Sequence, residues 1–295
     1  MLFAEIPSPP VHLHQLLTGW QTGTTSLAAL ASLLAVGAAY LVGVRRLARR
    51  GRRWSRARTA SFLGGLLVVE LAIGSGIASY DDSVFTMHVI QHLMLMNAAP
   101  PLLALGAPVT LLLQAAGRRS TTTALRVLHS RPVRLLTHPG VAFAGAMATM
   151  YVYFLTPLYA YSISHPLFHD FTHLEFLLSG CLFWWPVVGL DPIPHRLSYP
   201  ARMGYLGLAI PPSAFLGVAI LNDAHPIASV HTLADTHTGG SVLWGFSELF
   251  TVGALAVIFI QWMREEDRRA AREDRRLDAI AAAAASEAGE PTDPT

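Results

Sequence analysis

Two pairs of histidines with the same spacing lie in apolar parts of the chain. His88 and His92 are four residues apart in the stretch 85–108, which reads FTMHVIQHLMLMNAAPPLLALGAP, and His169 and His173 repeat the spacing further on. Residues i and i+4 share one face of a helix, so each pair predicts two imidazoles side by side. Ionisable side chains are costly in an apolar environment and usually serve a function there. The pattern therefore favours a metal or redox site, with a purely structural polar network as the alternative.

The composition indicates what kind of element holds these histidines. Of the 295 residues, 52% are hydrophobic and only 14% are charged, whereas soluble globular proteins carry about 25% charged residues. Seven apolar runs are long enough, at about 20 residues, to cross the hydrocarbon core of a bilayer. They are residues 25–44, 60–80, 84–105, 141–161, 166–190, 203–221 and 240–262. We therefore expect an all-α polytopic membrane protein with seven transmembrane helices.

The arginines predict the orientation of these helices. All 21 basic residues are arginines: eight in residues 45–58, five in 118–134, two in 196–202 and six in 264–276. In a seven-span arrangement all four groups fall on one side, which the positive-inside rule assigns to the cytoplasm. We expect the N-terminus outside and the C-terminus in the cytoplasm. The arginine runs are expected to anchor the chain at the lipid bilayer, and no nucleic acid is expected as a partner.

Two parts of the chain follow from this arrangement. Residues 1–262 are expected to form the seven-span transmembrane domain, and residues 263–295 a charged cytoplasmic helix with a disordered tail. The helix mixes charges at helical spacing, as with Glu265 and Arg269, before the tail SEAGEPTDPT. The first residues lack the positive start and compact apolar core of a signal peptide, so no cleavable leader is expected.

Three helices that descend from the outer face carry ligand-type side chains at similar depth. At about 1.5 Å per residue, His88 and His92 lie roughly 6 and 12 Å below the start of the third span. His169 and His173 lie about 5 and 10 Å below the start of the fifth span, and Glu248 lies about 12 Å below that of the seventh. The sequence does not say whether these three helices are neighbours.

The donor types narrow the choice of metal. Imidazole with carboxylate or thioether ligands suits copper or zinc. The single cysteine, Cys181, excludes a thiolate site. Facing histidines could instead hold haem between helices. Met87, Met94 and Met96 are expected to fill the core rather than to act as thioether ligands.

Four motifs, taken together, carry a resemblance to a known family. They read HVIQHLMLMNAAPPLLALGAP, GCLFWWPVVGLDPIPHRLSYPARMGYL, FLGVAI and DTHTGGSVLWGFSELF. Over residues 85–250 the chain resembles the multi-span CtaG family of cytochrome c oxidase assembly factors, of the Gram-positive type. The resemblance implies a non-enzymatic, multi-pass protein of the bacterial plasma membrane that is needed to make active haem–copper oxidase. It also implies copper binding near the outer membrane face and delivery of copper to the haem–copper centre. The implied partners are cytochrome c oxidase subunits and an extracytoplasmic copper chaperone.

The resemblance implies a set of metal ligands. The two histidine pairs described above match the motif histidines of the family, in HVIQH and in the HxxxH that precedes FLLSG. Asp235 and Glu248 match the acids on either side of the GG-x-x-x-W segment.

Two positions depart from the family pattern. Ser213 stands where the family often has a histidine before AFLGVAI, and Thr236 and His237 follow Asp235 where the family favours Asp-Gln. His237 or His231 would then substitute for a lost ligand, and we include His237 in the predicted metal site.

Two other classes of function stay open. An intramembrane zinc-dependent hydrolase would use histidine and acidic ligands to activate a water molecule, with Glu248 beside the metal. A bis-histidine haem or quinone redox protein would give the purified protein a visible absorption band.

Overall fold

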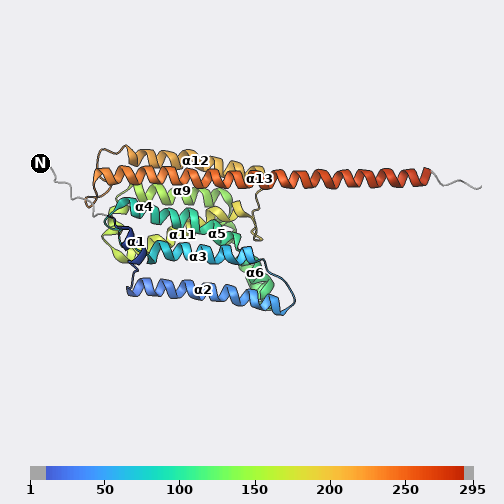
Figure 1. Ribbon diagram of the computed structural model, residues 1–295, viewed down its shortest axis with the longest axis horizontal. Coiled ribbons are helices and arrows are strands. Elements are labelled where there is room, and N and C mark those ends of the chain that lie inside the picture. Colours follow the sequence, from blue (N-terminus) through green and yellow to red (C-terminus); the bar gives the residue numbers. More distant parts are fainter. Residues whose placement is uncertain (1–10, 289–295) are drawn as a thin grey trace, which may run out of the picture.

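The computed structural model describes residues 11–288, and over that range it contains helices and turns but no strand. Most of the helices run side by side along one direction, and the last extends far beyond the others (Figure 1). In chain order they are α1 (Leu13–Thr18), α2 (Thr24–Arg49), α3 (Arg56–Gly74), α4 (Phe85–Leu93), the π-helix η1 (Met94–Ala98), α5 (Ala99–Leu105), α6 (Pro108–Ala115), α7 (Arg118–Leu128), α8 (Arg131–Leu136), α9 (Pro139–Leu155), α10 (Leu158–Ile163), α11 (Pro166–Val188), α12 (Tyr199–Leu221) and α13 (Leu233–Ala288).

Six helical segments of the described chain are long and apolar enough to cross a membrane. They are Thr24–Arg49, Arg56–Gly74, Phe85–Ala115, Pro166–Val188, Tyr199–Leu221 and Leu233–Ala283. The expected fourth span is divided at Pro157 into α9, an apolar helix of 17 residues, and the short α10. At about 1.5 Å per residue α9 is about 26 Å long, slightly less than the ~30 Å of a hydrocarbon core. The all-helical membrane fold is therefore confirmed, whereas the count of seven and the orientation remain predictions.

The segment from Phe85 to Ala115 lies at the centre of the bundle. In its most apolar stretch, 50% of the residues are buried, whereas in that of α2, at the edge of the bundle, only 11% are. Proline inside a helix usually bends or ends it, and here the helix continues through Pro100 to Leu105. Proline has no N–H to offer the carbonyl four residues earlier, and here the Met96 carbonyl instead accepts from Nε1 of Trp184 at 3.1 Å. The chain turns only at Ala107, whose φ is 47°.

The last helix, α13, passes from the seventh apolar run into the charged segment without a break. Ion pairs support the charged part: Glu265 lies 3.6 Å from Arg269 and 3.0 Å from Arg272. The helix extends to Ala288, so the first three residues of the predicted disordered tail are helical, in keeping with the high helix propensity of the preceding alanine run. Residues 289–295 of that tail lie outside the described residues.

Candidate metal centre

The first turn of α4 is fixed by an acid from a distant part of the chain. The carboxylate of Asp235, in the first turn of α13, accepts from the backbone N–H of Phe85 at 2.6 Å and of Thr86 at 3.1 Å. It also accepts from the Thr86 hydroxyl at 2.7 Å. A carboxylate at a helix N-terminus satisfies free N–H groups and matches the helix dipole. Asp235 thereby sets the position of the helix turn that carries His88.

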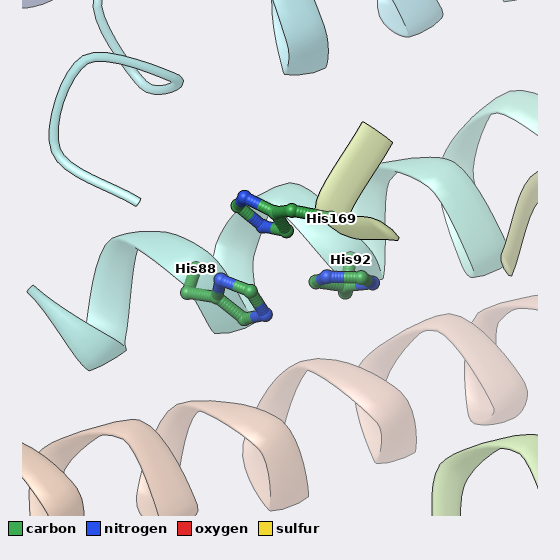
Figure 2. Close-up of side chains that lie close together, drawn as sticks. All are labelled: His88, His92 and His169. Carbon is green, nitrogen blue, oxygen red and sulfur yellow. The ribbon is translucent and has the colours of Figure 1, made fainter. Parts of the chain in front are cut away.

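Four imidazole rings meet between α4 and α11. Ring centroids are 4.3 Å apart for His88 and His92, 5.2 Å for His88 and His169, 5.5 Å for His92 and His173, and 4.6 Å for His169 and His173. Figure 2 shows His88 and His92 on one helix with His169 close to both. One nitrogen from each of these three lies within 4.8 Å of the other two, and all three residues are buried. The structure thus brings both sequence-predicted pairs to one place.

A chain of hydrogen bonds determines which nitrogen of His88 has a free lone pair. The Ser162 hydroxyl donates its hydrogen to the carbonyl of Tyr159 at 2.8 Å, so Tyr153 must donate to Ser162 at 2.7 Å. The Tyr153 oxygen can then only accept from Nε2–H of His88, at 3.1 Å. Nδ1 of His88 consequently carries a lone pair, and it has no protein partner.

His169 is oriented in the same way by a carboxylate. Its Nδ1 lies 3.2 Å from Oδ1 of Asp82, which can only accept. The lone pair is therefore on Nε2, which is buried without a partner. An imidazole that donates one N–H to a carboxylate and presents the other nitrogen is the usual arrangement of a metal-binding histidine.

His92 completes the group with two unpartnered nitrogens. Its ring is 2% exposed, and neither Nδ1 nor Nε2 finds a hydrogen-bond partner. Phe176 packs against it, with ring centroids 4.0 Å apart. A buried polar atom without a partner costs about 1–3 kcal/mol. A bound ligand that accepted or shared these nitrogens' hydrogen-bonding capacity would offset that cost on three neighbouring rings.

A second group shares His169 and lies toward the turn that follows α3. It consists of Asp81, His169 and His173, whose ligand atoms also lie within 4.8 Å of one another. Gln91 donates to Asp81 at 2.9 Å and to the Ala72 carbonyl at 3.0 Å. Its Oε1 must therefore accept from Nε2–H of His173, at 3.0 Å, which leaves the lone pair of His173 on Nδ1. Burial raises the pKa of Asp81 to about 6.

Three predicted ligands lie outside both groups. Asp235 is occupied in capping α4. His237 is half-buried, and its Nε2 donates to the Asp223 carbonyl at 2.9 Å. Glu248 lies on α13 with a buried Oε1 that has no partner, but neither His/Asp/Glu group in the described residues includes it. The donor set that the geometry supports is thus the four histidines with Asp81.

His231 also lies outside the groups but near them. Its Nε2 is 2.6 Å from the hydroxyl of Tyr159, whose ring lies 4.8 Å from that of His88. Burial lowers the pKa of His231.

Sequence reasoning missed the residues that orient the histidines. Gln91 could have been recognised as part of the site from the sequence, because it is a polar residue between His88 and His92 in an apolar run. Nothing in the sequence pointed to Tyr153 and Ser162, since they reach the cluster only through the packing of α9 and α10. Asp81 and Asp82 are consecutive acids between two apolar runs, a pattern typical of a solvated loop, whereas Asp81 is 6% exposed.

The cluster suits a metal ion better than haem. Nitrogens around a metal at about 2.0 Å are about 3.3 Å apart, so the three histidines must close slightly to share one ion. A porphyrin, by contrast, must fit between its two axial histidines. The ring pairs that face each other across α4 and α11 have centroids 5.2 Å apart for His88 and His169 and 5.5 Å apart for His92 and His173, which leaves no such gap.

Fold and cluster together define a polytopic, all-helical membrane protein with a buried histidine centre between its central helices. Residues 38–265 match the family described as the cytochrome c oxidase caa3 assembly factor (Caa3_CtaG). The chain belongs to this family, which confirms the resemblance seen in the sequence.

Relatives from mycobacteria are similar to nearly the whole chain. A protein of Mycobacterium bovis and one of Mycobacterium tuberculosis, both described as uncharacterized, are each 34% identical to it over 294 residues. A third, from Mycobacterium leprae, is 32% identical. Each alignment covers 93% of this chain and 44% of the relative, so the chain spans less than half the length of these proteins. No solved structure matches the chain.

Proposed function

We propose that this protein binds a copper ion at the buried histidine cluster and helps to deliver it to cytochrome c oxidase during assembly. One observation supports the proposal above others: one ring nitrogen from each of His88, His92 and His169 lies within 4.8 Å of the other two, and each of these rings has a buried nitrogen without a hydrogen-bond partner. Imidazole ligands suit copper, and the family is one of oxidase assembly factors.

The side chains around the cluster suggest how copper reaches it. Asp82 is 65% exposed and contacts His169, which belongs to both groups. A cation attracted to Asp82 would meet Asp81, His169 and His173 first, and then His88 and His92 deeper in the bundle. Neutral imidazoles replace its water ligands, and Asp81 supplies a compensating negative charge. The arginine distribution predicts that this end of the bundle lies at the outer face.

Delivery of copper requires one protein that supplies the ion and one that receives it. We propose that a cytochrome c oxidase subunit receives the copper in the plane of the plasma membrane, and that an extracytoplasmic copper chaperone supplies it. The charged part of α13 would then lie in the cytoplasm, away from the site of transfer.

A second candidate function is an intramembrane zinc-dependent hydrolase. The group of Asp81, His169 and His173 favours it, because two histidines and one carboxylate form a common ligand set of catalytic zinc. Its predicted acid, Glu248, is not part of that group. Zinc rather than copper in the purified protein, with hydrolase activity lost in Asp81→Asn, would support this function.

Metal analysis of the detergent-purified protein tests the proposal. We expect copper in the wild type and much less in His88→Ala/His92→Ala. The matched control is His138→Ala/His195→Ala, which removes another neighbouring pair, with ring centroids 5.0 Å apart. Equal copper in wild type and in His88→Ala/His92→Ala would contradict the metal site.

A deletion strain tests delivery separately from binding. We expect low oxidase activity with haem still inserted, restored by the wild type and by the control pair but not by His88→Ala/His92→Ala. Loss of haem together with copper would contradict a role specific to copper.

A further inference from the structure

A small cavity lies deeper in the bundle than the histidine cluster. It has a volume of about 20 Å³ and is lined from η1, α9, α11, α12 and α13. A single water needs about 10–15 Å³, so the cavity has room for one water or one ion. Met96 and Met150 are buried and line it, as does the partly buried Met147. Three of the chain's eight methionines therefore meet at one cavity.

The other polar atoms at this cavity are neutral oxygens and an amide. Asn97, Ser213, Ser247 and Thr251 contribute to its lining, and none of the described residues that line it is charged. Ser213 donates its hydrogen to the Ile210 carbonyl at 3.0 Å, and Thr251 donates to the Ser247 carbonyl at 2.8 Å. Both oxygens therefore keep lone pairs that can face a cation.

Ser247 adds an independent sign of a ligand. It is 5% exposed, and its hydroxyl has no hydrogen-bond partner among the described residues. A buried hydroxyl without a partner costs free energy that a bound ligand would recover.

The backbone at the cavity is also unusual. Met96 and Asn97 lie in the π-helix η1, and π-bulges within α-helices occur frequently at functional sites. Gly180 of α11 packs directly on this turn, because a Cβ there would come 2.5 Å from the Met96 carbonyl oxygen. The distorted turn is therefore held from the side by α11.

We propose that this cavity is a second metal site, which binds Cu(I) through the thioethers of Met96, Met147 and Met150. Thioethers are soft ligands that select Cu(I). The lining is uncharged, which favours a monovalent ion, because burial of a higher charge without compensation costs more. Met96 follows His92 by four residues, so the site lies roughly 6 Å further along the same helix. It extends the proposed copper function but depends on different residues.

Silver binding to the purified protein tests this site, since Ag(I) is a monovalent soft ion that, unlike Cu(I), is not oxidised by air. The variant Met96→Leu/Met147→Leu/Met150→Leu conserves side-chain volume, and we expect it to lose about one Ag(I) per chain relative to wild type. The matched control, Met87→Leu/Met94→Leu/Met203→Leu, removes three methionines that do not line the cavity and should keep the wild-type amount. Equal Ag(I) in wild type and in the cavity variant would overturn the proposal.

X-ray absorption of Ag(I) bound to His88→Ala/His92→Ala gives a second result that needs no change at the cavity. Sulfur neighbours around the silver would support the thioether site, whereas a shell of nitrogen and oxygen alone would overturn it. Failure of the histidine proposal is seen separately, as unchanged copper in that same variant.

Discussion

His169 donates its Nδ1–H to Asp82 at 3.2 Å, although the side chain of His169 is 8% exposed and that of Asp82 is 65% exposed. One hydrogen bond thus joins the buried cluster to the solvent-exposed turn between α3 and α4. It also determines the tautomer, because the carboxylate can only accept and the lone pair is left on Nε2.

Asp82→Ala should weaken metal binding without unfolding the protein. Loss of such an orienting partner typically lowers metal affinity about 10- to 100-fold, while an exposed substitution changes stability by about 0.5 kcal/mol or less. Competition with a chelator measures the affinity. Asp223→Ala is the control, since Asp223 is also an exposed acid beside a histidine, His225, at 3.9 Å. Equal affinities in the two variants would contradict a role for Asp82 in orienting His169.

Tyr153→Phe should weaken metal binding by a similar factor. The hydroxyl of Tyr153 is the acceptor for Nε2–H of His88, and without it the ring is free to take the tautomer whose Nδ1 cannot bind metal. We expect affinity to fall about 10- to 100-fold. Tyr151→Phe on the same helix removes a hydroxyl that donates to the Pro212 carbonyl instead, and it should leave affinity unchanged.

The two histidine pairs show how far sequence could define the site. The i, i+4 spacing and the arginine distribution predicted that each pair shares a face and lies near the outer end of its helix. That His88 approaches His169 depends on how α4 and α11 pack, which no local pattern encodes. The same holds for Asp235: its side chain acts on residues about 150 positions earlier in the chain, so its capping role could not be separated from ligation by sequence alone.

The boundaries of the helices were predictable only where composition changes. Each of the six long apolar segments overlaps an expected run, but Phe85–Ala115 and Leu233–Ala283 extend well beyond residues 84–105 and 240–262. The division at Pro157 was missed. The charged helix after Trp262 was predicted, but not that it continues α13 without a break. Hydropathy reports only how apolar a segment is, so it does not show where a proline starts a new short helix or whether a charged helix joins the span before it.

Asp235→Ala should destabilise the protein and also weaken metal binding. It leaves two N–H groups at the start of α4 without their acceptor, for a loss of about 1–2 kcal/mol, seen as a lower thermal midpoint in detergent. Asp191 is a matched comparison, because it accepts from the backbone of Thr110 at 2.7 Å at the start of α6, away from the histidines. Asp191→Ala should lower the midpoint but leave metal affinity unchanged. A fall in affinity with both variants would attribute the effect to general loosening of the fold.

Gly180→Ala should be destabilising, although glycine-to-alanine changes inside helices usually stabilise by about 0.5–1 kcal/mol. The new Cβ would lie 2.5 Å from the Met96 carbonyl oxygen and 2.8 Å from Met96 Cα, so α11 or the π-helix must move. Overpacking of this kind costs about 1–3 kcal/mol. Gly145→Ala is the matched control in α9, because a Cβ there meets nothing within 4 Å. It should change the thermal midpoint in the opposite direction in the same unfolding measurement.

Gly180→Ala should also reduce Ag(I) binding, whereas Gly145→Ala should not. The reason is that Met96, which the new Cβ would displace, lines the methionine cavity and is held by the hydrogen bond from Trp184 to its carbonyl. Destabilisation with full Ag(I) binding would mean that the π-helix is needed for packing but not for the second metal site.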